Sequence, residues 1–120
     1  MPATFTKGER LCGKSAVGAL LKGGRWGVAG PLKYCCLEGN GQEVDRLLVS
    51  VPKKLFKRAV KRNLLKRRMR EAYRTRKELL QPTPDGGRRD LLLQYNSTEV
   101  LPFADICASV ETILNKLSGR

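Results

Sequence analysis

One segment of the sequence, residues 57–74, limits the folds that this chain can adopt. Nine of its eighteen residues are Lys or Arg, and only Glu71 opposes them. At the helical period of about 100° per residue, Leu65, Met69, Ala72 and Tyr73 share one side, at spacings i, i+4, i+7 and i+8. We therefore predict a long helix over residues 57–80 that packs this apolar stripe on a core and leaves cations exposed.

The exposed side of this helix predicts a binding face. Six polar side chains fall within an arc of about 140° by the helical period: Arg62, Asn63, Lys66, Arg67, Arg70 and Arg74. The planar guanidinium of arginine can hold two phosphate oxygens at once or stack on a base. An asparagine amide adds both a donor and an acceptor.

The distribution of charge indicates the class of partner. Residues 53–77 contain thirteen Lys or Arg and one Glu, a net charge of +12, whereas the other 95 residues carry a net +1. Such asymmetry points to nucleic acid or to an anionic membrane surface. A membrane-surface helix would need its apolar residues to face lipid, but the core requires them here. No helix-turn-helix, zinc-finger ligand set or heptad repeat is visible, so structured RNA is favoured, and a ribosomal or DNA-binding role stays open.

The remaining pattern predicts one α+β domain over residues 1–120, a small sheet with helices packed on it. A short helix over 14–22 ends at Gly23 and Gly24. Strands are expected at 31–39 and 46–51, as an antiparallel pair, and at 90–95. A last helix follows Pro102, and its predicted core face consists of Phe103, Ile106, Val110, Ile113, Leu114 and Leu117.

The N-terminus has no apolar signal-peptide region and no stretch approaches the ~20 apolar residues of a membrane span, so we expect a cytoplasmic protein. The four cysteines form no CxxC pair and the chain has no histidine. Reduced, buried thiols are therefore expected rather than a zinc site. A stand-alone metal-dependent nuclease is disfavoured, because the aspartates are scattered and no general base is evident.

The segment "SVPKKLFKRAVKRNLLKRRMREAYR" resembles the protein subunit of bacterial ribonuclease P. That family has an Arg-Asn-Arg-x-x-Lys-Arg-like helix after a strand that ends in Lys-Lys. Here the strand is "LLVSV", the pair is Lys53 and Lys54, and "AVKRN" and "LKRRMREAYR" supply the helix. The flanking "ERL", "GG" and "DLLLQY" agree with the same family.

The resemblance implies a two-layer sandwich of α-β-β-β-α-β-α type with a left-handed β-α-β crossover. It also implies an accessory subunit of an endoribonuclease, inactive alone and without catalytic residues. Its partners would be the catalytic RNA, which holds Mg²⁺, and precursor tRNA, whose 5′ leader is removed; no membrane and no protein partner is predicted. The RNA-binding residues would be Lys53, Lys54, Arg58, Lys61, Arg62, Asn63, Lys66, Arg67, Arg70 and Arg74.

Two departures from the family pattern concern the binding residues. Leu64 stands where arginine is usual, so its cationic role is expected to pass to Lys61 or Arg68. The first helix usually offers two aromatic residues to the 5′ leader, and these align with Val17 and Leu21. Because aliphatic side chains cannot stack on bases, the leader contact is expected to be weaker or to rely on Tyr34 or Trp26.

Overall fold

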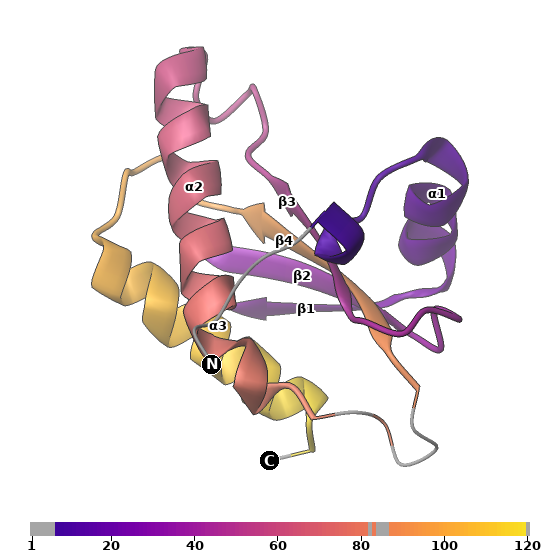
Figure 1. Cartoon of the computed structure of the whole chain (residues 1–120). Helices are drawn as coiled ribbons and strands as arrows, with labels where there is room; N and C mark the ends of the chain where they lie inside the picture. Colours follow the sequence, from indigo (N-terminus) through magenta and orange to yellow (C-terminus); the bar gives the residue numbers. More distant parts are fainter. Residues whose placement is uncertain (1–6, 82, 84–86, 120) are drawn as a thin grey trace.

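The computed structural model describes residues 7–81, 83 and 87–119. Four strands form one mixed sheet in the order β1-β2-β4-β3 (Figure 1): β1 (Arg25–Ala29), β2 (Leu32–Glu38), β3 (Arg46–Ser50) and β4 (Arg89–Tyr95). In the described residues, three α-helices and two short 3₁₀ turns accompany the sheet: α1 (Lys14–Gly23), α2 (Ala59–Arg76), α3 (Phe103–Leu117), η1 (Lys7–Glu9) and η2 (Lys77–Leu79). The predicted α+β class and element order are confirmed.

The strand pairing differs from the sequence prediction. We expected β2 and β3 to pair with each other, and this was wrong, because β4 lies between them. β4 pairs antiparallel with β2 and parallel with β3, so the chain crosses over through α2. The central position suits β4, since six of its seven residues are buried. β1 was not expected from the pattern, because most of its residues are exposed and give no apolar alternation. The hand of the crossover stays a prediction.

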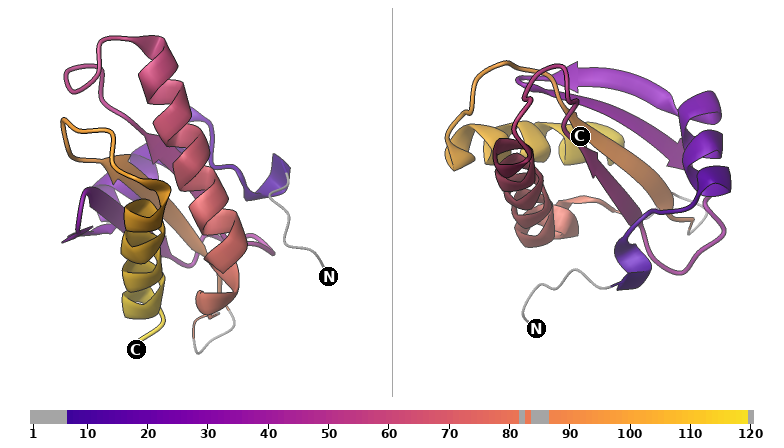
Figure 2. Two further views of the ribbon diagram at one scale, coloured as in Figure 1. Left: turned by 90° about the vertical axis from the view of Figure 1, so that its left-hand side faces the viewer. Right: turned by 90° about the horizontal axis from the view of Figure 1, so that it is seen from above.

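The main core lies where α2 and α3 cover one face of the sheet (Figure 2). The predicted stripe of α2 is confirmed, since Leu65, Met69 and Ala72 are fully buried and Tyr73 is 1% exposed. Each large apolar side chain buried in this way contributes about 1.5–3 kcal/mol. These contacts fix the rotation of α2 about its axis and therefore turn its cations away from the sheet.

Helix α1 packs on the opposite face of the sheet, against a smaller cluster of Leu11, Leu20, Cys35 and Leu92. Gly24 makes this close approach possible. A Cβ at that position would lie 2.4 Å from the Cys35 sulfur and 2.6 Å from the carbonyl oxygen of Leu20. The junction after α1 therefore needs a residue without a side chain.

The cysteines are free thiols, as predicted, but they are not all buried. Cys35 and Cys36 face opposite clusters, and burial raises the pKa of Cys36 to about 12. Cys107 is also buried. Cys12, in the segment before α1, is exposed, so the prediction of a buried thiol was wrong for this residue. Among the described residues, none of the helices combines the length and the apolar character that a membrane span requires.

Candidate nucleic-acid interface

The cations of α2 and its flanks divide into two groups along the helix. Those at the C-terminal end are paired with acids: Arg74 with Glu71, Arg76 with Glu111 at 2.8 Å, and Lys77 with Glu9 at 2.8 Å. Within the part of the chain that the structure describes, no Lys or Arg from residue 53 to residue 70 forms an ion pair with a carboxylate. The net positive charge is thus concentrated on the N-terminal half of α2 and the loop before it.

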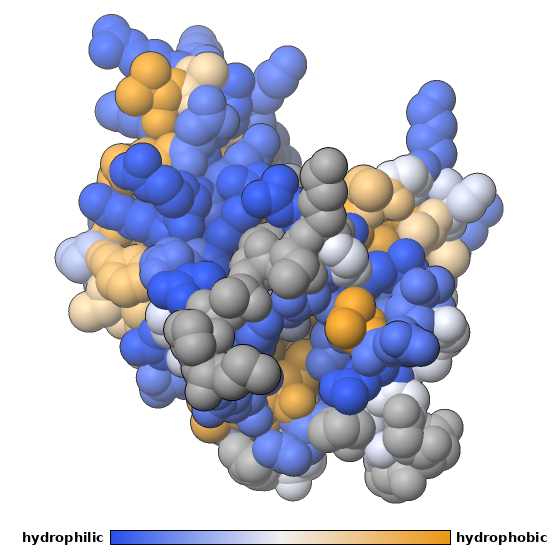
Figure 3. Space-filling model, viewed as in Figure 1, coloured by the Kyte–Doolittle hydropathy of each residue, from blue (hydrophilic) through white to orange (hydrophobic). Residues whose placement is uncertain are grey.

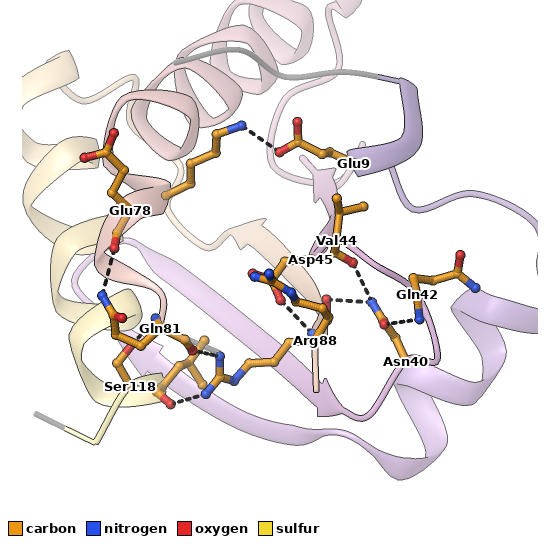
Figure 4. Close-up of polar contacts among 12 residues, drawn as sticks. Glu9, Asn40, Gln42, Val44, Asp45, Glu78, Gln81, Arg88 and Ser118 are labelled. Atoms are coloured by element: carbon orange, nitrogen blue, oxygen red, sulfur yellow. Dashed lines mark hydrogen bonds and ion pairs between the residues drawn. The ribbon is translucent and has the colours of Figure 1, made fainter. Parts of the chain in front are cut away.

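The C-terminal end of α2 borders an acidic hollow of about 310 Å³ (Figure 4). Glu9, Glu43, Asp45 and Glu78 line it together with Lys77 and Arg88. Burial raises the pKa of the Asp45 carboxyl, although the backbone N–H of Arg89 and the charge of Arg88 act in the opposite direction. These acids offset the local cations, so this end of the helix is unsuited to phosphate.

A groove of about 640 Å³ runs along the N-terminal half of α2. It brings together four of the predicted RNA-binding residues, Asn63, Lys66, Arg67 and Arg70, beside the apolar Val60 and Leu64. Partial burial, together with the charge of Arg10, lowers the pKa of Arg70. Figure 3 shows the hydrophilic surface over this helix, interrupted by apolar patches.

Arg10 extends this cationic surface from a distant part of the sequence. It lines a hollow of about 150 Å³ with Arg70, beside the start of β3. Sequence reasoning missed Arg10, because sixty residues separate it from Arg70 and long-range contacts such as the bridge of Arg10 to Leu47 bring the two together.

The start of α2 concentrates positive charge further. Arg58 occupies the N-cap without a side-chain capping hydrogen bond, and the first turn contains no acidic residue. The helix dipole already favours anions at this end, so cations such as Arg58 and Lys61 destabilise the helix unless an anion binds there. Lys53 and Lys54, which precede them in a turn, are exposed as well.

Arg62 has a structural contact that the sequence did not reveal. Its Nη1 donates to the carbonyl oxygens of Phe56 and Lys57, each at 2.8 Å, and so holds the loop against the helix. This contact also explains why α2 begins at Ala59 and not at the predicted residue 57, since the two carbonyls are engaged by a side chain. Arg62 is therefore only partly available for RNA.

The two residues expected to replace the cationic role at Leu64 lie in different surroundings. Arg68 is half-buried and its Nη1 donates to the carbonyl oxygen of Leu101 at 3.1 Å, in the loop before α3. Lys61 is exposed at the start of the helix. Neither Lys61 nor Arg68 lines the groove itself.

The predicted leader-binding residues are divided between the two faces of the sheet. Val17 is half-buried against the cluster under α1, and Leu21 is 43% exposed on the same helix. Tyr34 packs against the main core on the other face of the sheet, where its ring lies over Gly27. Tyr34 therefore cannot share a cleft with α1.

Trp26 lies on the face of the sheet that α1 partly covers. It is the register partner of Cys35, whose side chain packs under α1, and directly opposed residues in an antiparallel pair point to the same side. The indole is 46% exposed, with the Lys33 ammonium 4.9 Å from its ring centroid. Gln94 pairs with Lys33 and adds a polar side chain to this face.

The arrangement of the acidic and cysteine side chains does not suit a protein-bound metal ion. Among the described residues, no group of three or more His, Cys, Asp or Glu side chains could hold one.

Comparisons with known proteins agree with this architecture. The model of the Ribonuclease P family matches residues 5–118. The ribonuclease P protein component of Porphyromonas gingivalis is 43% identical over 83 residues, which cover 66% of this chain and 61% of that relative's length. The chain thus aligns with less than two thirds of this curated relative.

Solved structures show the same fold at lower identity. The ribonuclease P protein of Thermotoga maritima matches with a TM-score of 0.74 at 22% identity, over 90% of this chain and 96% of that chain. The Staphylococcus aureus protein matches with a TM-score of 0.70 at 22% identity, over 88% and 92% of the two chains. The predicted resemblance is confirmed, and because the family model covers nearly the whole sequence, this chain belongs to the ribonuclease P protein family.

Proposed function

We propose that this protein is the protein subunit of ribonuclease P and binds the catalytic RNA through the N-terminal half of α2. The observation that carries the proposal is that, in the part of the chain that the structure describes, the cations of α2 and its flanks are paired with acids only at the C-terminal end of the helix. Among the described residues, those of residues 53–70 have no carboxylate partner. Unpaired cations held on a helix that is anchored by Leu65 and Met69 form a rigid surface for phosphates.

The family's role in tRNA processing gives this surface its substrate. Asn63, Lys66, Arg67 and Arg70 would contact the backbone of the catalytic RNA, with Lys53, Lys54, Arg58 and Lys61 extending the contact toward the loop. The protein supplies no catalytic residue in this proposal, and Mg²⁺ is held by the RNA. The alternative is a protein that binds structured RNA without a role in cleavage.

The test is reconstitution with the catalytic RNA encoded by the same genome and a precursor tRNA, over a range of Mg²⁺ concentrations. We expect no cleavage by the protein alone and the largest stimulation of the RNA at low Mg²⁺. Cations on the protein can replace diffuse metal ions that offset repulsion between phosphates, and this replacement matters most when metal is scarce.

The possible outcomes separate the candidate functions. Cleavage by RNA-free protein would indicate a nuclease and overturn the proposal. RNA binding without any stimulation of cleavage would support the alternative of a structured-RNA-binding protein. Stimulation that is equal at low and high Mg²⁺ would show that the cations do not act by reducing phosphate repulsion.

We also propose that the 5′ leader of precursor tRNA lies on the α1 side of the sheet and stacks on Trp26. The indole is exposed on the face of the sheet that α1, with Leu21, partly covers. It can therefore supply the aromatic surface that α1 lacks. Lys33, 4.9 Å from the ring centroid, would neutralise a leader phosphate. Base stacking on an aromatic side chain contributes roughly 1–3 kcal/mol.

Replacing Trp26 by leucine is therefore expected to reduce the preference of the holoenzyme for precursor over mature tRNA by about tenfold. The measurement is the ratio of the two dissociation constants. Tyr34→Leu is the matched control, because this ring packs on the opposite face of the sheet, and its ratio should stay within about twofold of the wild type. A ratio that falls with Tyr34→Leu and not with Trp26→Leu would move the leader to the other face.

A further inference from the structure

Phe103 has the helical spacing of the apolar face of α3, but it is not buried with the other residues of that face. Ile106, Val110, Ile113 and Leu114 of that face are fully buried, whereas Phe103 is 38% exposed. It stands at the first position of the helix, after the loop that contains Leu101. An exposed aromatic ring at this place does not serve the main core.

The exposed ring lines a hollow of about 320 Å³ between α2 and the start of α3, which we call the Phe103 pocket. Its other walls are Arg67, Arg68 and Glu71 of α2, and its exposed surface is mostly carbon. Arg68 is held in place by its hydrogen bond to the Leu101 carbonyl oxygen at 3.1 Å. Arg67 also lines the groove of Asn63 and Lys66, so the pocket continues the candidate nucleic-acid interface.

We propose that the Phe103 pocket binds one unstacked base of the catalytic RNA. The proposal rests on the proposed function and adds a base-binding site to a face that would otherwise hold only backbone phosphates. Aromatic rings and guanidinium planes are the side chains on which splayed-out bases stack. Its volume lies at the low end of the ~300–1,000 Å³ typical of ligand pockets, which suits a single base and not a helix.

The charges around the pocket favour a base over a free phosphate and RNA over a protein segment. The Glu71 carboxylate in its wall is already paired with Arg74, and its oxygens can also accept a hydrogen bond from a base N–H. Arg67 and Arg68 give the wall of the pocket positive charge, and both belong to the segment of net charge +12. A polyanionic chain that follows the groove would carry its bases directly past Phe103.

The test compares the affinity of three full-length variants for the catalytic RNA at one fixed salt concentration. Phe103→Leu keeps an apolar side chain and removes the π-face, so its dissociation constant is expected to rise about tenfold. Phe103→Tyr keeps the ring and should stay within about twofold of the wild type. Val44→Ala is the matched control, because Val44 is 39% exposed but lines the acidic hollow.

A second measurement does not require the Phe103→Leu variant to be stable. Protein labelled with 4-fluorophenylalanine carries fluorine at its three Phe positions, and the Phe103→Tyr spectrum identifies the signal of Phe103. Saturating RNA is expected to shift this signal upfield by ring stacking.

Unchanged affinity of Phe103→Leu, or an unshifted Phe103 signal in the RNA complex, would overturn the pocket proposal while leaving the proposed function intact. Failure of the wild-type protein to bind the catalytic RNA would overturn both. Equal losses of affinity in Phe103→Leu and Phe103→Tyr would indicate that the pocket requires the exact shape of the phenylalanine side chain. Stacking would then not explain the binding, and the proposal would be contradicted.

Discussion

Replacing both Lys66 and Arg67 by glutamine is expected to weaken binding of the catalytic RNA about 100-fold. Each side chain lines the groove on the N-terminal half of α2. Hydrogen bonds to charged groups contribute about 1.5–3 kcal/mol each, so the loss of two such bonds to phosphate gives an effect of this size at the low end of the range. Filter binding at a fixed salt concentration measures it.

The salt dependence of the same double variant identifies the cause of the loss. Each phosphate contact contributes about −0.7 to −0.9 to the slope of log K against log salt concentration. Loss of two contacts should therefore make the slope smaller in magnitude by about 1.4–1.8. A large loss of affinity with an unchanged slope would indicate a structural defect and not the loss of two phosphate contacts.

The matched control for this double variant is Arg76→Gln with Lys77→Gln. The change of charge is the same and lies near the other end of α2, but these side chains are paired with Glu111 and Glu9. We expect less than about a threefold loss of affinity. If the control weakened binding as much as the Lys66 and Arg67 pair, only the total charge would matter, and the localised face would be rejected.

Arg62 is left unchanged in this experiment for a physical reason. Its guanidinium donates to the carbonyl oxygens of Phe56 and Lys57, so its replacement would also loosen the loop before α2. Lys66 is half-buried at the side of the helix and Arg67 is exposed, and neither side chain holds the loop before α2 as Arg62 does. The melting temperature of the Lys66 and Arg67 variant should therefore equal that of the wild type.

Asp90→Ala is expected to lower the free energy of unfolding by about 3–5 kcal/mol. The carboxylate is 3% exposed and accepts hydrogen bonds from Arg46 Nε and Nη2, both at 2.8 Å, and from Asn40 Nδ2 at 3.0 Å. Its removal leaves the Arg46 guanidinium, with a side chain only 20% exposed, without a counter-charge. Urea denaturation monitored by circular dichroism measures the change.

The position of this ion pair explains why the effect should exceed that of a surface pair. Arg46 and Asp90 are register partners at the start of the parallel β3–β4 pair, and β3 leads into the loop and α2. The control is Glu111→Ala, which breaks the Arg76 pair, where the side chains are 27% and 49% exposed, and should cost less than about 1 kcal/mol. Similar losses in the two variants would show that Asp90 contributes no more than an exposed carboxylate.

The sequence by itself determined which sides of α2 face the core and the solvent. The positions of Leu65, Met69 and Tyr73 repeat with the helical period, and this period is a local property that any packing of the helix must respect. The buried stripe therefore followed from spacing alone, and the side left for a partner followed with it. The family resemblance on the same segment supplied the function that spacing could not.

Only the tertiary structure decided which residues meet across the fold. The insertion of β4 between β2 and β3 separates two strands that are neighbours in sequence. The strand register then places Trp26 on the face of the sheet that α1 covers and Tyr34 on the opposite face of the sheet. A shift of the register by one residue would exchange these faces. Neither assignment is encoded in the residues near those aromatics.

The availability of the cations was decided in the same way. Lys77 is neutralised by Glu9, which is 68 residues away in sequence, and Arg76 by Glu111, which is 35 away. Phe103 likewise has the spacing of a core residue, yet it lies beside Arg67 and Arg68 because α3 begins there against α2. Local periodicity specifies the sides of a helix, but long-range packing specifies which charges and rings remain for a partner.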